Sequence, residues 1–277
     1  MGKTVLITGV SSGIGRLTAE LMASRGWQVA GTSRDPGPLN GWAAEHGVTL
    51  FQLDVTDEKR VAAVVSAVVE RFGGIDVLVN NAGYGVFGPL EGATAAQVEA
   101  QFRANLLGPL ALIRHVMPVM RARRDGTIVN VSSIAGRMGS PFASLYHASK
   151  FAIEGFSESF RYEASLHGVR LKLIEPSHFK TGFMTRSLQL AAHEAYDTQL
   201  GNYMEWVYLE DEKAPAPLPV AEAILRVAED RSSRLRYPVK GKLVLALVSL
   251  LPDAVWRSLM GGGMTRRPRP SRSQKTS

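Results

Sequence analysis

Short apolar segments alternate with longer segments of helical periodicity along most of this chain. Buried-strand patterns rich in β-branched residues fall at residues 3–8, 27–32, 48–53, 75–79, 127–131 and 169–174. Helical patterns follow at about residues 15–25, 57–72, 94–106, 109–124, 146–167 and 220–230. Such alternation is typical of a parallel sheet covered by helices. A chain of 277 residues with 45% hydrophobic content can bury one large core, so we expect a single α/β domain.

Two segments carry apolar residues outside this alternation. Residues 181–209 hold too many of them for a plain surface loop. We expect either a lid over an apolar substrate site, at about residues 181–215, or an ordinary pair of amphipathic helices. The run at residues 243–251 has nine residues, about 14 Å as a helix, too short for a bilayer core of ~30 Å. We therefore expect no transmembrane segment there, and either core packing or a peripheral membrane contact.

The net charge of +7 is concentrated at the C-terminus. Residues 261–277 are rich in Gly, Pro, Ser and basic residues, with no apolar residue after Met264. This composition predicts a disordered basic tail after a domain of residues 1–260. A solvated terminus is favoured over a tether to an acidic membrane or to nucleic acid, so we expect no nucleic-acid partner. The five basic residues responsible are Arg266, Arg267, Arg269, Arg272 and Lys275.

Cysteine and histidine usage narrows the chemistry. The chain has no cysteine, which excludes disulfides, thiolate nucleophiles, iron–sulfur clusters and sulfur-ligated zinc. The six histidines are scattered without a ligand spacing, so we expect no metal. An apolar strand begins after three residues, without a secretory signal pattern, and we expect a cytoplasmic protein.

A glycine-rich turn, TGVSSGIG, follows the first strand and precedes the first helix. In that context, glycines let the backbone turn sharply and approach a pyrophosphate, whose charge lies at the helix N-terminus. The two serines add hydroxyl donors. We therefore predict a dinucleotide site that includes Gly9, Ser11, Ser12, Gly13, Ile14 and Gly15.

The residues after the second and third strands bear on the choice of nucleotide. An acid after the second strand would bind a ribose 2′-hydroxyl, but Ser33 and Arg34 stand there. A guanidinium suits a phosphate, so we predict NADP(H), with Asp35 next in sequence as the contrary signal. Asp54 can either accept from the adenine amino group or act as a helix N-terminal acid, and both interpretations stay open.

Three side chains predict carbonyl chemistry. Tyr146 and Lys150 lie four positions apart in YHASK, on one face of a helix. A tyrosine titrates near pH 10, so proton transfer at neutral pH needs about three pKa units of help, part of which an ammonium supplies. Ser133 can hold the substrate oxygen. Taken alone, the Tyr–Lys pair also fits a half-exposed helix face.

Together these motifs resemble the short-chain dehydrogenase/reductase family over about residues 3–240. The resemblance rests on TGVSSGIG, the step from Asp54 to Val55, NNAG at residues 80–83, Asn105, Ser133, YHASK, and the turn from Pro176 to Thr181. Within the family, the chain is similar to the NADP-dependent branch of 17β-hydroxysteroid dehydrogenase-like and retinol dehydrogenase-like members. RYPVKGK at residues 236–242 contributes to that similarity.

The resemblance implies a Rossmann-type, doubly wound, mostly parallel seven-stranded sheet with helices on both faces. It also implies a catalytic tetrad. Asn105 would anchor a water in a proton relay, Ser133 would orient the carbonyl, and Tyr146 would protonate it. Lys150 would bind the nicotinamide ribose and make Tyr146 more acidic.

The cofactor residues implied beyond the glycine turn are Ser33, Arg34, Asp54, Val55, Asn81, Ala82, Gly83, Tyr146, Lys150, Pro176 and Thr181. Thr181 would meet the carboxamide. One departure is Ser177, where the family usually has glycine after proline. We expect an NADP(H)-dependent oxidoreductase acting on a bulky hydrophobic secondary alcohol or ketone, as a homodimer or homotetramer; the alternative is a non-catalytic NADPH sensor of the same fold.

Overall fold

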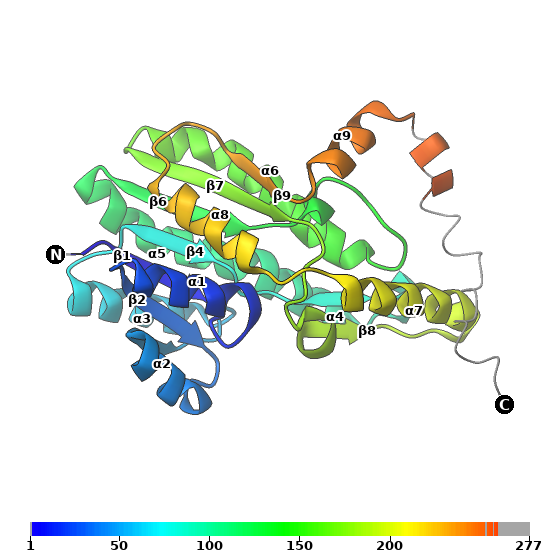
Figure 1. The fold of residues 1–277 in the computed structure, drawn as a ribbon, viewed down its shortest axis with the longest axis horizontal. Helices are drawn as coiled ribbons and strands as arrows, with labels where there is room; N and C mark the ends of the chain where they lie inside the picture. The colour runs from blue at the N-terminus through cyan, green and yellow to red at the C-terminus, as the bar shows by residue number, and fades with distance from the viewer. Residues whose placement is uncertain (1, 253, 257, 260–277) are drawn as a thin grey trace.

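The computed structural model describes residues 2–252, 254–256 and 258–259. Seven strands form one sheet in the order β3-β2-β1-β4-β6-β7-β9, and all neighbouring strands run parallel. The strand order reverses direction between β1 and β4, as in doubly wound folds (Figure 1). The predicted fold class is confirmed. The strands are β1 (Thr4–Thr8), β2 (Gln28–Ser33), β3 (Val48–Gln52), β4 (Val77–Asn80), β6 (Gly126–Val131), β7 (Val169–Pro176) and β9 (Arg236–Val239).

Helices cover both faces of this sheet. On one face lie α1 (Gly13–Ser24) and α8 (Leu218–Glu229), and on the other lie α3 (Glu58–Phe72), α5 (Gly108–Arg123) and α6 (Ser144–Ser165). The short helix α2 (Asn40–His46) packs beside β3. Single-turn 3₁₀ segments occupy Gly37–Leu39, Leu90–Gly92, Ile134–Gly136 and Glu194–Tyr196.

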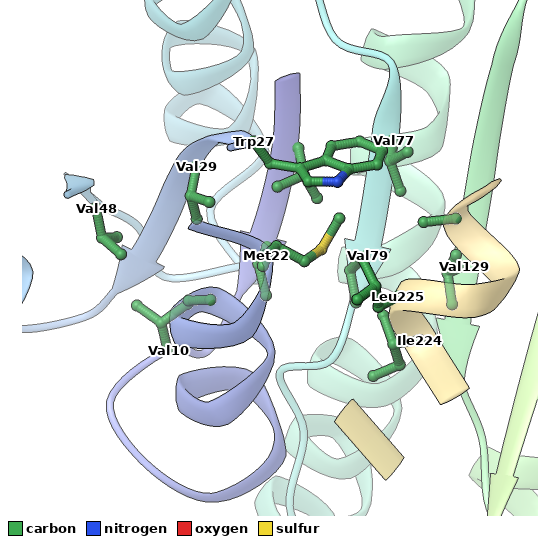
Figure 2. Packing of buried hydrophobic residues seen from close by; sticks show 14 of the residues in the cluster. Val10, Met22, Trp27, Val29, Val48, Val77, Val79, Val129, Ile224 and Leu225 are labelled. Atoms are coloured by element: carbon green, nitrogen blue, oxygen red, sulfur yellow. The ribbon is translucent and has the colours of Figure 1, made fainter. Parts of the chain in front are cut away.

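The two faces have separate apolar cores because side chains alternate along each strand. In β1, Val5 and Ile7 belong to the core under α1 and α8, whereas Leu6 belongs to the opposite core. Figure 2 shows Trp27 and Met22 meeting over the sheet in the first of these cores. Burial of each such side chain contributes about 1.5–3 kcal/mol. These cores fix the strand ends, where the candidate site lies.

The predicted helices at residues 94–106 and 109–124 form one continuous helical segment. Thr94 and Gln97 form a capping box that starts α4 (Ala95–Phe102). A π-helical turn, Arg103–Leu107, then leads directly into α5. The expected break is absent, and Pro109 lies just after the π-helical turn, in the first turn of α5.

Residues 181–215 begin with a π-helical turn, Phe183–Ser187. The strand β8 (Leu188–Leu190) then pairs in parallel with β5 (Gly85–Phe87), forming a second, two-stranded sheet. Helix α7 (Asp197–Lys213) completes the segment. This small sheet had no sequence prediction, because three-residue strands carry too few positions to show a period.

The seventh strand, β9, falls within the RYPVKGK run, and α9 (Lys242–Leu250) follows it. No helix among residues 2–252, 254–256 and 258–259 is long and apolar enough to cross a bilayer. The predicted basic tail at residues 261–277 lies outside the described residues.

Candidate active site

The glycine-rich turn between β1 and α1 packs against two other loops. Gly9 and Gly13 have positive φ angles of 74° and 57°. A Cβ atom on Gly13 would lie 2.8 Å from the carbonyl oxygen of Thr181, and one on Gly9 would lie 3.0 Å from Cα of Ala82. A Cβ on Gly15 would collide with the Gly9 carbonyl. Only glycine therefore fits these positions, and the turn presents backbone rather than side chains.

The N-terminus of α1 is arranged to receive an anion. Ser12 is the N-cap residue in extended backbone, its side chain does not cap the helix, and the first turn contains no acid. The backbone N–H groups of that turn thus keep their positive field for a ligand. Ser11 is exposed beside them, and Ile14 packs against the core. These residues fit the pyrophosphate of a dinucleotide.

The NNAG loop is tied to the end of β1 by Thr8. Its Oγ1 accepts hydrogen bonds from the backbone nitrogens of Asn81 and Ala82, both at 3.0 Å. Asn81 Nδ2 donates to the carbonyls of Thr8 at 2.9 Å and of Gly9 at 3.1 Å. Thr8 was not assigned from the sequence, although a hydroxyl residue ending a buried strand before the glycine turn was a usable signal.

The residues after β2 leave Arg34 exposed at the carboxyl edge of the sheet. Its backbone carbonyl accepts from Nε2 of Gln52 at 3.1 Å, which fixes the local chain. Ser33 is buried, and its hydroxyl donates to the carbonyl of Asp35 at 2.9 Å. The Arg34 side chain is therefore open to solvent at this edge, and its role as a phosphate ligand stays a prediction.

After β3, the carboxylate of Asp54 is used locally. Its Oδ1 accepts from the backbone nitrogen of Thr56 at 2.9 Å and from the Thr56 hydroxyl at 2.8 Å. The N-cap of α3 is Asp57, whose Oδ1 accepts from the Arg60 nitrogen at 3.0 Å. Val55 is buried against Gly108. Of the two interpretations of Asp54, the helix N-cap role belongs to Asp57 instead.

The structure brings Ser133, Tyr146 and Lys150 together at the carboxyl edge of β6. Ser133 lies close enough to Tyr146 for its hydroxyl to lower the pKa of Tyr146. Lys150 Nζ lies 5.8 Å from the centroid of the Tyr146 ring and donates to the Val131 carbonyl at 2.9 Å. Ser133 Oγ lies 3.3 Å from the carbonyl of Pro176, to which it can also donate. Two loops and one helix thus set the position of the Tyr146 hydroxyl.

Burial governs the protonation of this pair. Loss of water raises the pKa of Tyr146 to about 12, and the Ser133 hydroxyl opposes that shift. Burial lowers the pKa of Lys150 to about 8, opposed by the negative charge of Glu154. The sequence predicted a lowered tyrosine pKa, but the direction is reversed because desolvation outweighs the effect of the Ser133 hydroxyl. Tyr146 therefore keeps its proton at neutral pH, as a proton donor requires.

Asn105 lies in the π-helical turn between α4 and α5. Its Oδ1 accepts from the Tyr84 nitrogen at 3.0 Å, and its Nδ2 donates to the Tyr84 carbonyl at 2.8 Å and to Ser149 Oγ at 3.1 Å. Ser149 precedes Lys150 on α6. The Asn105 amide therefore joins a loop to the helix that carries Tyr146 and Lys150.

Gln101, one turn before Asn105, was missed by sequence reasoning. It is fully buried, its Nε2 donates to the Tyr84 carbonyl at 2.8 Å, and its Oε1 accepts from the Val86 nitrogen at 2.7 Å. Spacing of four between Gln101 and Asn105 places both amides on one helix face, which was the available signal. Together they hold the segment of residues 84–86 beside Tyr146.

Apolar side chains surround the ring of Tyr146. Phe183 and Phe87 have ring centroids 5.6 and 5.8 Å from it. They belong to a third apolar cluster, separate from the two sheet cores, that also contains buried residues of α7. These buried α7 residues are Leu200, Tyr203, Met204 and Val207. Helix α7 thus packs its apolar face into the cluster that includes the Tyr146 ring.

Comparison with known proteins identifies the family. Residues 3–191 match the family model described as short chain dehydrogenase. The chain belongs to the short-chain dehydrogenase family. This is an oxidoreductase family, and the resemblance inferred from the motifs is confirmed.

Several relatives of this short-chain dehydrogenase cover most of its length. A 3-ketodihydrosphingosine reductase from Bacteroides thetaiotaomicron is 36% identical over 90% of this chain and 93% of its own. Retinol dehydrogenase 8 of Homo sapiens is 35% identical over 84% of this chain and 80% of its own. The 17-beta-hydroxysteroid dehydrogenase type 1 of Mus musculus is 37% identical over 84% of this chain and 72% of its own. The predicted likeness to both dehydrogenase types is confirmed.

Solved structures agree. The crystal structure of a short-chain dehydrogenase from Streptomyces avermitilis has a TM-score of 0.82 at 33% identity, covering 94% of this chain and 96% of its own. A metagenomic short-chain oxidoreductase in complex with NADP has a TM-score of 0.70 at 28% identity. The match covers 86% of this chain and 96% of its own.

One departure of this short-chain dehydrogenase from its family is accommodated without strain. The backbone nitrogen of Ser177, where glycine is usual, donates to the carbonyl of Val239 on β9 at 3.1 Å. The φ angle of Ser177 is not positive, so a side chain fits there. The serine therefore leaves the turn between Pro176 and Thr181 intact.

Proposed function

We propose that this protein is an NADP(H)-dependent oxidoreductase that transfers a hydride between the nicotinamide and a secondary alcohol or ketone. The observation that carries the proposal is the convergence of three side chains: Lys150 Nζ lies 5.8 Å from the Tyr146 ring, and Ser133 is close enough to lower the pKa of Tyr146. A bound nicotinamide would supply or accept the hydride there, and the protein provides position and a proton.

The residues suited to hold the cofactor line the carboxyl edge of the sheet. The turn from Gly9 to Gly15 and the N-terminus of α1 fit its pyrophosphate. The loop that Thr8 anchors, with Asn81, Ala82 and Gly83, would shape the adenine side. Thr181 is in contact with Gly13 and would meet the carboxamide. The exposed Arg34 favours NADP(H), and an NADP complex of a structural neighbour supports the same choice.

The side chains would divide the chemistry of carbonyl reduction. Tyr146 keeps its proton, because burial raises its pKa to about 12, and would donate it to the carbonyl oxygen as that oxygen gains electron density. Ser133 would hydrogen-bond the same oxygen. Lys150 would stabilise the tyrosinate that remains, because its charge lies 5.8 Å from the Tyr146 ring. Asn105 would support this arrangement through Ser149.

The substrate in this proposal is bulky and apolar, such as a steroid, a retinoid or a lipid-derived ketone. The third apolar cluster supports it, because Phe87, Phe183 and residues of α7 meet the ring of Tyr146. Residues 181–215 would act as the lid over this substrate. The names of the relatives, a sphingoid ketone reductase among them, point to the same class. Self-association as a homodimer or homotetramer stays a prediction.

The deciding experiment measures NADPH consumption with steroid ketones, retinal, a sphingoid ketone, short aliphatic ketones and sugars, for the wild type and Tyr146→Phe. We expect turnover of an apolar ketone that falls by at least about a hundredfold in the variant, with NADPH affinity unchanged. Tight NADPH binding with no turnover of any ketone would favour the non-catalytic sensor. Equal turnover by the variant would remove Tyr146 from the chemistry.

A further inference from the structure

Helix α9 exposes an unusually apolar surface. Residues 243–250 are Leu, Val, Ala and one Ser, and none of the residues of α9 is buried. Leu243 is 74% exposed and Leu250 is 80% exposed. Further along the chain, Val255 and Leu259 are also exposed, to 44% and 59%. Figure 1 shows α9 projecting from the body of the fold. A contiguous apolar surface of this kind marks an interaction site.

The net positive charge of the chain comes from the same stretch of sequence. Eight basic residues and one acidic residue fall within residues 240–277, so this segment carries a net +7. That value equals the net charge of the whole chain, and residues 1–239 are therefore neutral overall. Lys240 and Lys242, at the start of α9, are both exposed. The apolar helix is thus flanked by positive charge, and its partner must carry negative charge.

We propose that α9 and its flanking basic residues dock this protein onto an anionic lipid surface. The apolar side chains of α9 enter the boundary between headgroups and acyl chains, and the basic residues bind the lipid phosphates. A helix of nine residues, about 14 Å long, lies along such a surface and does not span it.

Other partners would account for only one of the two features, the exposed apolar helix or the positive charge beside it. A nucleic acid would match the charge but would leave the exposed leucines of α9 in water. A second copy of the chain would cover the leucines but would bring two segments of net +7 together. An anionic bilayer offers apolar depth and negative charge at once.

The docking helix begins next to the candidate active site. Gly241 precedes α9, and a Cβ atom there would collide with Ile134, the residue after Ser133. The strand before it, β9, is held to the turn after β7 by the hydrogen bond from Ser177 to Val239. Docking through α9 therefore brings the carboxyl edge of the sheet close to the lipid, the direction from which an apolar substrate would arrive.

The test is co-sedimentation of the full chain with vesicles of phosphatidylcholine alone and of phosphatidylcholine with phosphatidylglycerol. We expect binding to the anionic vesicles only, lost as added salt shortens the screening length. The triple variant Leu243→Gln, Leu247→Gln, Leu250→Gln should bind at least about tenfold more weakly. Its matched control replaces three exposed leucines elsewhere, Leu90→Gln, Leu166→Gln and Leu218→Gln, and should bind like the wild type.

A second variant separates the contribution of charge. Replacing Arg266, Arg267 and Arg269 by Gln should weaken binding to the anionic vesicles by roughly a hundredfold. Equal binding to both vesicle types, or none to either, overturns the proposal. The proposal is also overturned if the leucine triple variant dissociates an oligomer, as measured by sedimentation velocity, while its vesicle binding stays that of the wild type. Tight binding to duplex DNA that survives the leucine changes would assign the segment to nucleic acid instead. Each readout is independent of catalytic activity.

Discussion

Asn105 satisfies both backbone groups of Tyr84, accepting from its nitrogen at 3.0 Å and donating to its carbonyl at 2.8 Å. The remaining amide hydrogen reaches Ser149 at 3.1 Å, on the helix of Tyr146 and Lys150. One side chain therefore joins the loop after β4 to the catalytic helix. The π-helical turn makes this possible, because its wider winding lets the chain continue while Asn105 faces inward.

We expect Asn105→Ala to lower the free energy of unfolding by about 1–3 kcal/mol, because the Tyr84 nitrogen and the Ser149 hydroxyl lose their partner, although the Tyr84 carbonyl keeps Gln101. Turnover should fall as well, since the loop next to Tyr146 is released. Urea unfolding and steady-state kinetics measure the two effects. Thr94→Ala, which removes the exposed N-cap of α4, is the control and should leave turnover unchanged. Wild-type stability and turnover in Asn105→Ala would contradict this role.

The glycine turn gives a second prediction. Gly13→Ala places a Cβ atom 2.8 Å from the Thr181 carbonyl in a residue with a φ of 57°. We expect NADPH affinity to fall by roughly tenfold or more, because the turn must shift away from the cofactor. Gly155→Ala on α6 is the control, since its Cβ would meet nothing within 4 Å. Fluorescence titration with NADPH measures both, and equal affinities would show that the turn does not contact the nucleotide.

Much of this site was readable from the sequence because its motifs are local. Tyr146 and Lys150 are related by helical spacing, and the glycines by a turn that requires them. Thr8 and Gln101 were not predicted from the sequence, because their roles depend on contacts with loops that lie 73 and 17 residues away along the chain. The direction of the Tyr146 pKa shift was wrong for a related reason. The sequence shows a nearby ammonium, but only the fold shows how much water is lost.

The pairing of Lys150 with Glu154 predicts a pH effect. Burial lowers the Lys150 pKa to about 8, and the buried Glu154 carboxylate holds it from falling further. With Glu154→Gln, the Lys150 pKa drops, so Lys150 loses its charge at a lower pH. The alkaline limb of the kcat/KM profile should then move towards acid, by about one pH unit.

Glu158→Gln is a matched control for Glu154→Gln. Glu158 lies one turn further along α6 and also binds Arg236, at 2.8 Å, compared with 2.9 Å for Glu154. Its carboxylate is exposed, and Lys150 does not depend on it. The control profile should therefore keep its alkaline limb. Identical shifts in both variants would mean that loss of an Arg236 partner, and not the charge beside Lys150, sets the profile.

Lys172 gives the last prediction, concerning stability away from the site. Its side chain is fully buried in β7, and Nζ donates to the carbonyls of Ser232 at 2.7 Å and of Arg234 at 3.1 Å. The Asp230 carboxylate lies 3.5 Å from Lys172 Nζ and neutralises its positive charge. This cluster fixes the chain between α8 and β9, and so the register of the sheet's edge strand.

We expect Lys172→Met to lower the free energy of unfolding at neutral pH by about 1–3 kcal/mol, because two carbonyls lose their donor. The Asp230 pKa is held below its usual value, chiefly by the Tyr237 hydroxyl and also by Lys172. A carboxyl group whose pKa is depressed in the folded state stabilises the fold at pH values above its unfolded pKa, near about 4. This stabilisation is lost as the pH falls from that value through the lower pKa of the folded state. The difference between the wild type and the variant should therefore narrow in acid. The control is Lys213→Met, which removes an exposed ion pair with Glu210 and should have the stability of the wild type at every pH. Urea unfolding at a series of pH values compares the three proteins.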